Sequence, residues 1–194
     1  MKSLQVIAFN GSPRKSGNTH DMLQVVLQEL ERQGIQTQTM HIGGRPVRGC
    51  KDCGACYHSP LMKCAIDDWV NEAIEKMLEA DGILIASPAY FGDLTPETKA
   101  LMDRAGVVTR SKGYSALRRK VGAAVAVARR AAGMNVLDSI NHFFTINEFV
   151  IPSSNYWNLA YGKDMGQALE DEEGVMIMKT LAENMAWVMK KLNQ

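Results

Sequence analysis

The sequence has no long hydrophobic run and almost no net charge. No apolar stretch approaches the roughly 20 residues that a membrane-spanning helix needs, and a net charge of +1 gives no bulk attraction to nucleic acid or to anionic membranes. The opening "MKSLQVIAFNGS" lacks the longer apolar core and the small-residue cleavage site of a signal peptide. We therefore expect a cytoplasmic protein that binds neither membrane nor nucleic acid.

The 194 residues are long enough for one domain with a substantial core, and no repeat, low-complexity tract or linker divides them. We expect a single domain over residues 1–194, in which buried apolar runs alternate with amphipathic stretches. Such alternation predicts a parallel sheet with right-handed crossovers and helices on both faces. The predicted strands cover residues 4–12, 35–42, 82–91, 121–130 and 148–154. The predicted helices cover residues 19–34, 67–82, 95–107, 133–147 and 170–192.

The loop after the first predicted strand, "GSPRKSGNT", is rich in glycine, hydroxyl groups and positive charge. A helix N-terminus offers unpaired N–H groups, and Gly11 and Gly17 let the backbone approach a ligand closely. The loop therefore suits a phosphate, although it is neither a Walker loop nor a dinucleotide-binding GxGxxG. The alternative is a plain turn with an N-cap at Asn18 or Thr19.

Two further loops follow predicted strands and should meet the first at the carboxyl edge of the sheet, where such folds bind ligands. "SPAYFGD" (87–93) supplies aromatic surface on a backbone shaped by Pro88 and Gly92, unless its aromatic rings simply pack inward. "ARRAAG" (128–133) adds small residues and two arginines. One phosphate loop beside one site for a planar ring describes FMN better than NAD or ATP.

Four cysteines, Cys50, Cys53, Cys56 and Cys64, form a C-x2-C-x2-C-x7-C pattern in a loop (43–66) before the second long helix. In a reducing compartment such a cluster indicates metal ligands or redox groups rather than disulfides. The spacing suits a [4Fe–4S] cluster, which takes four Cys ligands, whereas zinc ribbons use two separated pairs. Zinc and free or redox-active thiols remain alternatives, because the loop also carries several charged residues.

The segments "GSPRKSGNT", "ASPAYFGDLTPETKALMDR" and "VARRAAG" resemble the flavodoxin-like NADPH-dependent FMN reductase superfamily. The cysteine spacing resembles that of its iron–sulfur flavoprotein branch. The resemblance implies an α/β flavodoxin-like three-layer sandwich with a five-stranded parallel sheet in the order 2-1-3-4-5. It also implies an FMN phosphate at Ser12, Arg14, Ser16, Asn18 and Thr19, and an isoalloxazine ring at Pro88, Ala89, Tyr90, Phe91 and Gly92, with Ala128, Arg129 and Gly133 near its other side. The third motif departs from its commoner form, in which a glycine falls earlier than Gly133.

We therefore expect an FMN-dependent oxidoreductase with a [4Fe–4S] cluster that passes electrons from ferredoxin or NAD(P)H to a small-molecule acceptor. The flavin supplies the chemistry, so no side chain is assigned a catalytic role. The family implies a homodimer or homotetramer, in which the aromatic segment 155–162 could cover a neighbouring flavin or pack against its own domain. Two alternatives are an NAD(P)H-dependent FMN or quinone reductase without a cluster, and a non-enzymatic zinc or thiol sensor.

Overall fold

The protein, described here as a computed structural model, is built on a five-stranded parallel sheet in the order β2-β1-β3-β4-β5. This confirms the predicted topology. The structure describes residues 3–193, so residues 1–2 and 194 of the expected domain lie outside the described part. The strands are β1 (Gln5–Asn10), β2 (Gln36–His41), β3 (Gly82–Pro88), β4 (Val121–Ala128) and β5 (Leu159–Tyr161).

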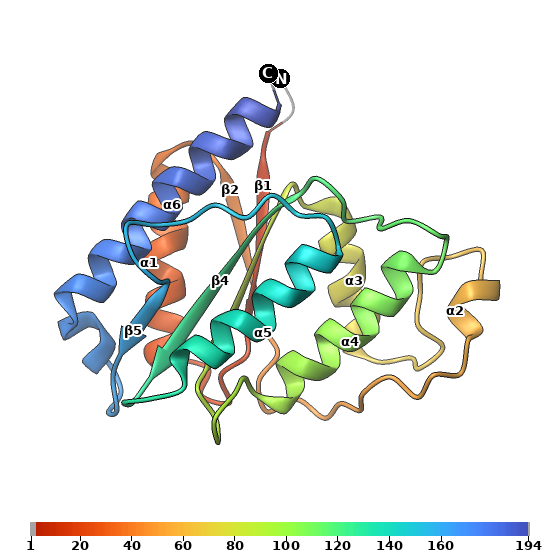
Figure 1. Ribbon diagram of the computed structural model, residues 1–194, viewed down its shortest axis with the longest axis horizontal. Coiled ribbons are helices and arrows are strands. Elements are labelled where there is room, and N and C mark those ends of the chain that lie inside the picture. Colours follow the sequence, from red (N-terminus) through yellow and green to blue (C-terminus); the bar gives the residue numbers. More distant parts are fainter. Residues whose placement is uncertain (1–2, 194) are drawn as a thin grey trace.

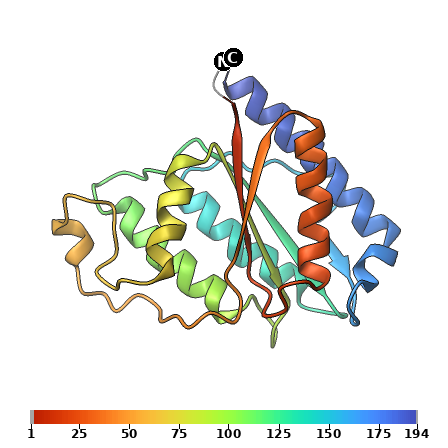
Figure 2. The same cartoon turned by 180° about the vertical axis from the view of Figure 1, so that it is seen from behind.

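Helices cover both faces of the sheet and give a three-layer sandwich (Figure 1). Helices α1 and α6 lie on one face and α3, α4 and α5 on the other, as the view from behind also shows (Figure 2). Within residues 3–193, no helix is both long and apolar enough to cross a membrane. The helices are α1 (Asn18–Arg32), α2 (Ala55–His58), α3 (Trp69–Glu79), α4 (Pro96–Arg110), α5 (Gly133–Ile146), the 3-10 helix η1 (Gln167–Glu170) and α6 (Glu172–Leu192).

Successive side chains of β1 enter opposite layers of the core. Ile7 and Phe9 pack in the layer under α3, α4 and α5, while Val6 and Ala8 pack in the layer under α1 and α6. Strand β4 is buried along its whole length. Burial on both faces explains why these strands have continuous apolar sequences rather than alternating ones.

The fifth strand lies later in the chain than predicted. Residues 148–154 make only an isolated bridge, from Val150 to the first residue of β4, whereas β5 pairs with the last three residues of β4. Phe149 instead packs its ring against Phe144, with 4.9 Å between the ring centroids. Pro152 then ends this run of pairing because it has no N–H group to donate. In this segment Phe149 therefore packs against α5, while Val150 and Ile151 are exposed, before the chain returns to the sheet.

Candidate functional site

A cavity of about 560 Å³ opens at the carboxyl edge of the sheet. Its walls come from the loops after β1, β3, β4 and β5, which lie far apart in the sequence and meet because the strands are parallel (lower edge in Figure 1). This volume is within the range of about 300–1,000 Å³ that small-molecule and cofactor sites occupy. The cavity is lined by Ser12, Pro13, Arg14, Asn18, Thr19, Pro88, Ala89, Tyr90, Val127, Arg129, Gly162, Lys163 and Asp164.

Side chains from β1, β2 and the start of α4 hold the loop after β1 in place. Asn10 Oδ1 accepts a hydrogen bond from the backbone N–H of Ser12 at 3.0 Å, and His41 Nε2 lies 2.8 Å from the Ser12 carbonyl oxygen. Thr95 Oγ1 donates to the Gly11 carbonyl oxygen at 2.8 Å. Two carbonyl groups of the loop are thus engaged by the protein, on the sides that face β2 and the start of α4.

Two glycines permit this close packing. A Cβ atom on Gly11 would lie 2.0 Å from Thr98 Oγ1, and one on Gly43 would lie 2.1 Å from the Ser12 carbonyl oxygen. Neither distance is possible for a real Cβ atom, so any side chain at these positions would displace the loop. The loop is therefore fixed by its contacts rather than by its own turn residues alone.

Helix α1 begins at the end of this loop. Its N-cap residue, Gly17, is extended, and no side chain caps the first-turn N–H groups. Such a helix end offers unpaired donors and partial positive charge to an anion. Arg14 lines the cavity beside it and adds a full positive charge. The residues present therefore fit a phosphate group.

The loop after β3 forms a tight, exposed turn. Tyr90 donates its N–H to the Asp93 carbonyl oxygen at 2.7 Å, and Ala89 donates to the Val127 carbonyl oxygen at 2.8 Å. Phe91, with φ of 48°, adopts a left-handed conformation that is uncommon for a residue with a side chain. Its ring is fully exposed and lies edge-on to that of Tyr90. This loop gives the cavity an apolar and backbone-rich wall, which suits a planar ring.

The last wall of the cavity, Gly162 to Asp164, follows β5 and was not predicted. Asn18 holds it, because its Nδ2 donates to the Asp164 carbonyl oxygen at 2.8 Å and its Oδ1 accepts from the Ala168 N–H at 3.2 Å. The Asn18 side chain, expected beside a phosphate, is thus engaged in joining two walls. The short apolar run before Gly162 could have indicated this wall, but the fifth strand is predicted at residues 148–154 and the run is therefore not taken as a strand.

The cavity therefore collects only part of the predicted residue set. Gly133 begins α5 and packs against the side chain of Leu159, where a Cβ would lie 2.3 Å from Cδ1. The predicted residues that line the cavity are Ser12, Arg14, Asn18, Thr19, Pro88, Ala89, Tyr90 and Arg129, and those that do not are Ser16, Phe91, Gly92, Ala128 and Gly133.

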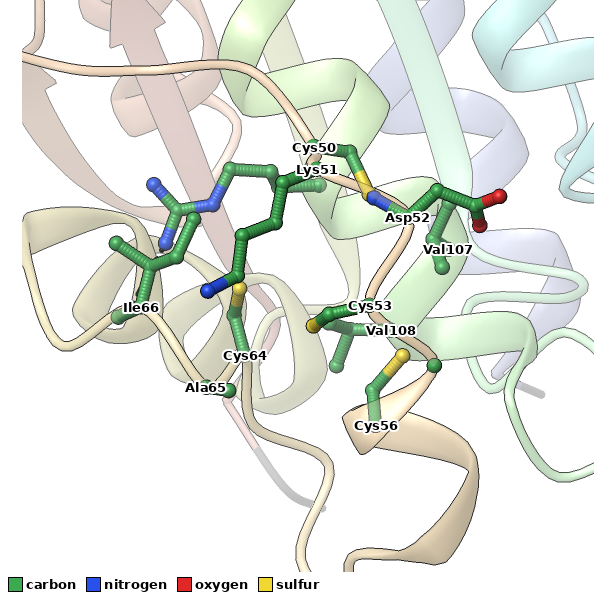
Figure 3. A pocket seen from close by; sticks show the side chains of 12 residues that line it. Cys50, Lys51, Asp52, Cys53, Cys56, Cys64, Ala65, Ile66, Val107 and Val108 are labelled. Carbon is green, nitrogen blue, oxygen red and sulfur yellow. Dashed lines mark hydrogen bonds between the residues drawn. The ribbon is translucent and has the colours of Figure 1, made fainter.

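The four cysteines line a second, smaller cavity between the 43–66 loop and the side of α4. Figure 3 shows Cys64 on one side of it and Cys53 and Cys56 on the other. Gly54 adopts φ of 69° just before α2, which turns the chain within the cysteine motif. Cys56 is buried, whereas Cys50 and Cys53 are exposed.

The donor set of this second cavity fits a four-cysteine cluster. Within residues 3–193, however, no group of three or more Cys, His, Asp or Glu side chains is arranged to hold a metal ion. Burial raises the pKa of the Cys56 thiol, and charges on the other three cysteines add to this effect.

Cys64 is fixed by its neighbour Asn71. The Cys64 N–H donates to Asn71 Oδ1 at 2.8 Å, and Asn71 Nδ2 donates back to the Cys64 carbonyl oxygen at 3.1 Å. Asn71 also donates to the Ile66 carbonyl oxygen at 3.1 Å. The fourth cysteine of the motif is therefore anchored to the first turn of α3, although it lies in an irregular segment.

A buried arginine that sequence reasoning did not single out borders the same cavity. Arg104, on α4, is 1 % exposed and forms two hydrogen bonds with the Asp68 carboxylate, at 2.7 and 2.9 Å. Burial alone would lower the pKa of Arg104, but its hydrogen bonds with Asp68 and its closeness to the Cys64 side chain outweigh burial and raise it. Arg104 therefore stays positively charged next to the cysteines.

The two cavities share no lining residue. The cysteine loop leaves β2 at the carboxyl edge and runs along the outside of α4 to α2, away from the first cavity (Figure 1). Any transfer between groups held in the two places would therefore have to cross either the protein interior or a contact with another chain.

Comparison with known proteins identifies the family. Residues 4–164 match the NADPH-dependent FMN reductase family. An iron–sulfur flavoprotein of Methanocaldococcus jannaschii is 33 % identical over 198 residues, which cover 98 % of this chain and 100 % of that protein. The iron–sulfur flavoprotein of Methanosarcina thermophila is 32 % identical, with 98 % of each chain covered.

A solved structure supports the fold assignment. The flavoenzyme FerB, an NAD(P)H:(acceptor) oxidoreductase from Paracoccus denitrificans, superposes with a TM-score of 0.68 at 19 % identity, covering 97 % of this chain and 98 % of that one. With the flavodoxin-like fold, the phosphate-type helix end and the four-cysteine loop in place, the chain belongs to the NADPH-dependent FMN reductase family, in its iron–sulfur flavoprotein branch.

Proposed function

We propose that the protein is an electron-transferring oxidoreductase that holds FMN in the carboxyl-edge cavity and a [4Fe–4S] cluster on Cys50, Cys53, Cys56 and Cys64. The observation that carries this proposal is that one chain has two cavities. The first, at the carboxyl edge of the sheet, includes a helix N-terminus that suits a phosphate, and the second is lined by four cysteines. When bound, the flavin supplies two-electron and one-electron transfer and the cluster supplies one-electron transfer.

The residues around the first cavity bind and orient the flavin in this proposal. The first turn of α1, with Ser12, Arg14 and Thr19, would hold the phosphate, because these groups line the cavity at its positive end. Ala89 and Tyr90 would contact the ring, and Arg129 would lie on the wall after β4. The chain's part is to position the ring and to shield it from water, so no side chain is required as a general acid or base.

The separation of the two cavities favours an oligomer as the working unit. Because the cavities share no residue and the cysteine loop extends away from the flavin cavity, we propose a homodimer or homotetramer in which the cysteines of one chain approach the flavin of another. Tyr156 and Trp157 form an exposed aromatic pair, with 4.6 Å between ring centroids, that is available for such a contact. Analytical ultracentrifugation tests this, and a monomer at assay concentration would contradict it.

We further propose that ferredoxin or NAD(P)H reduces the protein and that a small molecule accepts the electrons. The test is anaerobic reduction of the FMN-loaded protein by reduced ferredoxin and by NADPH, compared between the natural protein and C53S. Removing one ligand should abolish rapid flavin reduction by ferredoxin while the FMN content stays unchanged. S59A, in the same loop, is the matched control and should behave like the natural protein.

An NAD(P)H-dependent reductase without a cluster is the second candidate, favoured by the exposure of Cys50 and Cys53 to solvent. It predicts rapid flavin reduction by NADPH, and equal rates in C53S and the natural protein with every donor. The third possibility, a zinc or thiol sensor, predicts a protein that binds no FMN. The same experiment therefore separates all three.

A further inference from the structure

Arg104 has one donor that the protein leaves unused. Its Nη1 and Nη2 groups bond to Asp68, and Nη2 also donates to the Ile66 carbonyl oxygen at 2.9 Å. Its Nε group is buried and has no hydrogen-bond partner. A buried donor without an acceptor destabilises a protein, so such a group calls for an explanation.

The surroundings of this donor indicate what it could bind. Arg104 borders the cavity that Cys50, Cys53, Cys56 and Cys64 line. The apolar side chains of Val107 and Val108 form much of the rest of that wall. The motif supplies four sulfur atoms to this cavity, and Figure 3 shows its one carboxylate, that of Asp52, turned away from Cys53, Cys56 and Cys64.

The Asp68 carboxylate does not fully neutralise the positive charge of Arg104 on the side that faces the cavity. Its side chain is 0 % exposed, whereas the side chain of its partner Asp68 is 23 % exposed. Water therefore screens the carboxylate but not the guanidinium, and a positive potential remains at the buried end of the pair. Cysteine thiolates on a metal cluster carry the opposite charge.

We propose that Arg104 is a positioning residue for an anionic, thiolate-ligated cluster in this cavity, donating from Nε to a sulfur atom and stabilising the cluster's negative charge. The inference rests on the proposed function, since it requires the cluster. The one-electron reduction of a cluster adds one negative charge, and nearby charge and hydrogen bonds to sulfur set its reduction potential. Arg104 therefore favours the reduced form and raises the potential.

A purely structural role is the alternative, because the pair of Arg104 and Asp68 also fastens α4 to the first turn of α3. Asp68 is the N-cap of α3, accepting a hydrogen bond from the Val70 N–H at 3.1 Å. The two roles predict different shifts of the cluster's reduction potential when Arg104 and Asp68 are replaced in turn. If the Arg104–Asp68 pair only holds α4 and α3 together, replacing either residue should shift the reduction potential in the same direction. If Arg104 acts through its charge, the two replacements should shift the potential in opposite directions.

The test is a redox titration of the anaerobically purified, FMN-loaded protein, with dithionite as the electron donor, redox dyes as mediators and the reduced cluster followed by EPR. In R104M the ratio of reduced to oxidised cluster at a fixed potential should fall at least tenfold, which is a potential lower by about 59 mV for one electron. In D68N, where asparagine still caps α3, the ratio should rise.

K51M is the matched control for charge. Lys51 borders the same cavity but is exposed, so water screens its charge and its removal should shift the potential less than R104M does. Shifts of the same sign in R104M and D68N, or no shift in R104M, would overturn the role of Arg104. If R104M is not folded or loses its iron, R104Q, which also removes the positive charge, and D68N decide the question by the same opposite signs.

Failure of the proposed function gives a different result. The natural protein would then contain FMN but no iron or acid-labile sulfide, and the cluster and the role of Arg104 would be overturned together. A natural protein with a full cluster, whose potential is insensitive to Arg104, would overturn this inference alone.

Discussion

Replacing Gly43 with alanine should weaken FMN binding by displacing the phosphate loop. A Cβ atom at this position would lie 2.1 Å from the Ser12 carbonyl oxygen and 2.6 Å from that of Gly11, both of which belong to the loop. Because real Cβ contacts under 3.0 Å essentially never occur, the loop has to shift. His41 and Asn10 hold the same loop, so it cannot simply turn aside without losing their hydrogen bonds.

The magnitude follows from the phosphate contacts that such a shift would break. A hydrogen bond to a charged group contributes about 1.5–3 kcal/mol, and each 1.4 kcal/mol is about a factor of ten in affinity. Loss of one such bond in G43A should raise the Kd for FMN by about 10- to 100-fold. Riboflavin, which has the ring but no phosphate, should bind both proteins within about twofold of each other.

Quenching of flavin fluorescence during titration of the apoprotein measures both affinities. G49A is the control, because a Cβ at Gly49 would meet no atom within 4 Å, and it should bind FMN as the natural protein does. Circular dichroism shows whether each variant is folded. A folded G43A that binds FMN within twofold of the natural protein would refute the account of the phosphate site.

Two more predictions concern the walls of the two cavities. N18A should lower the free energy of unfolding in urea by about 1–3 kcal/mol, because it removes the buried hydrogen bonds that join α1 to the wall after β5. The control N184A, at an exposed hydrogen bond, should change it by less than about 0.5 kcal/mol, and equal effects would contradict the prediction. In the apoprotein, Cys56 should react with iodoacetamide more slowly than the exposed Cys50, because burial raises its pKa and leaves less thiolate at a given pH. Raising the pH should speed the reaction of Cys56, and mass spectrometry that finds equal rates for both cysteines would contradict this account.

The strands that are buried on both faces could be predicted from the sequence because their composition reports that burial directly. The apolar runs at β1, β3 and β4 have no polar face to solvate, so their position along the chain follows from hydrophobicity alone. The strand order required the resemblance to a known family, since local sequence does not say which strands are neighbours. The structure confirmed that order.

Strand β5 could not be placed from local sequence because it is short and at the edge. The apolar residues of 148–154 look like a strand, but tertiary packing uses Phe149 to fill a gap against Phe144, and pairing resumes only at β5. The error carried over to the site. The cavity wall from Gly162 to Asp164 follows the real β5 and therefore could not be assigned.

The role of Arg104 was hidden for a different reason. In the sequence, Arg104 is a charged residue on an amphipathic helix, and charged residues on such helices normally face solvent. Its partner Asp68 is 36 residues away, and the two meet only when α4 packs beside the start of α3. The spacing of the cysteines is a local property and could be recognised, whereas the buried charge beside them depends on the fold.

Whether one chain holds both FMN and a four-iron cluster can be read from a visible absorption spectrum of protein purified without oxygen. Iron and acid-labile sulfide are assayed on the same sample. We expect flavin peaks with a broad shoulder and about four irons per chain. Flavin peaks without iron or sulfide would contradict the cluster, and a colourless protein that does not take up added FMN would contradict the whole account.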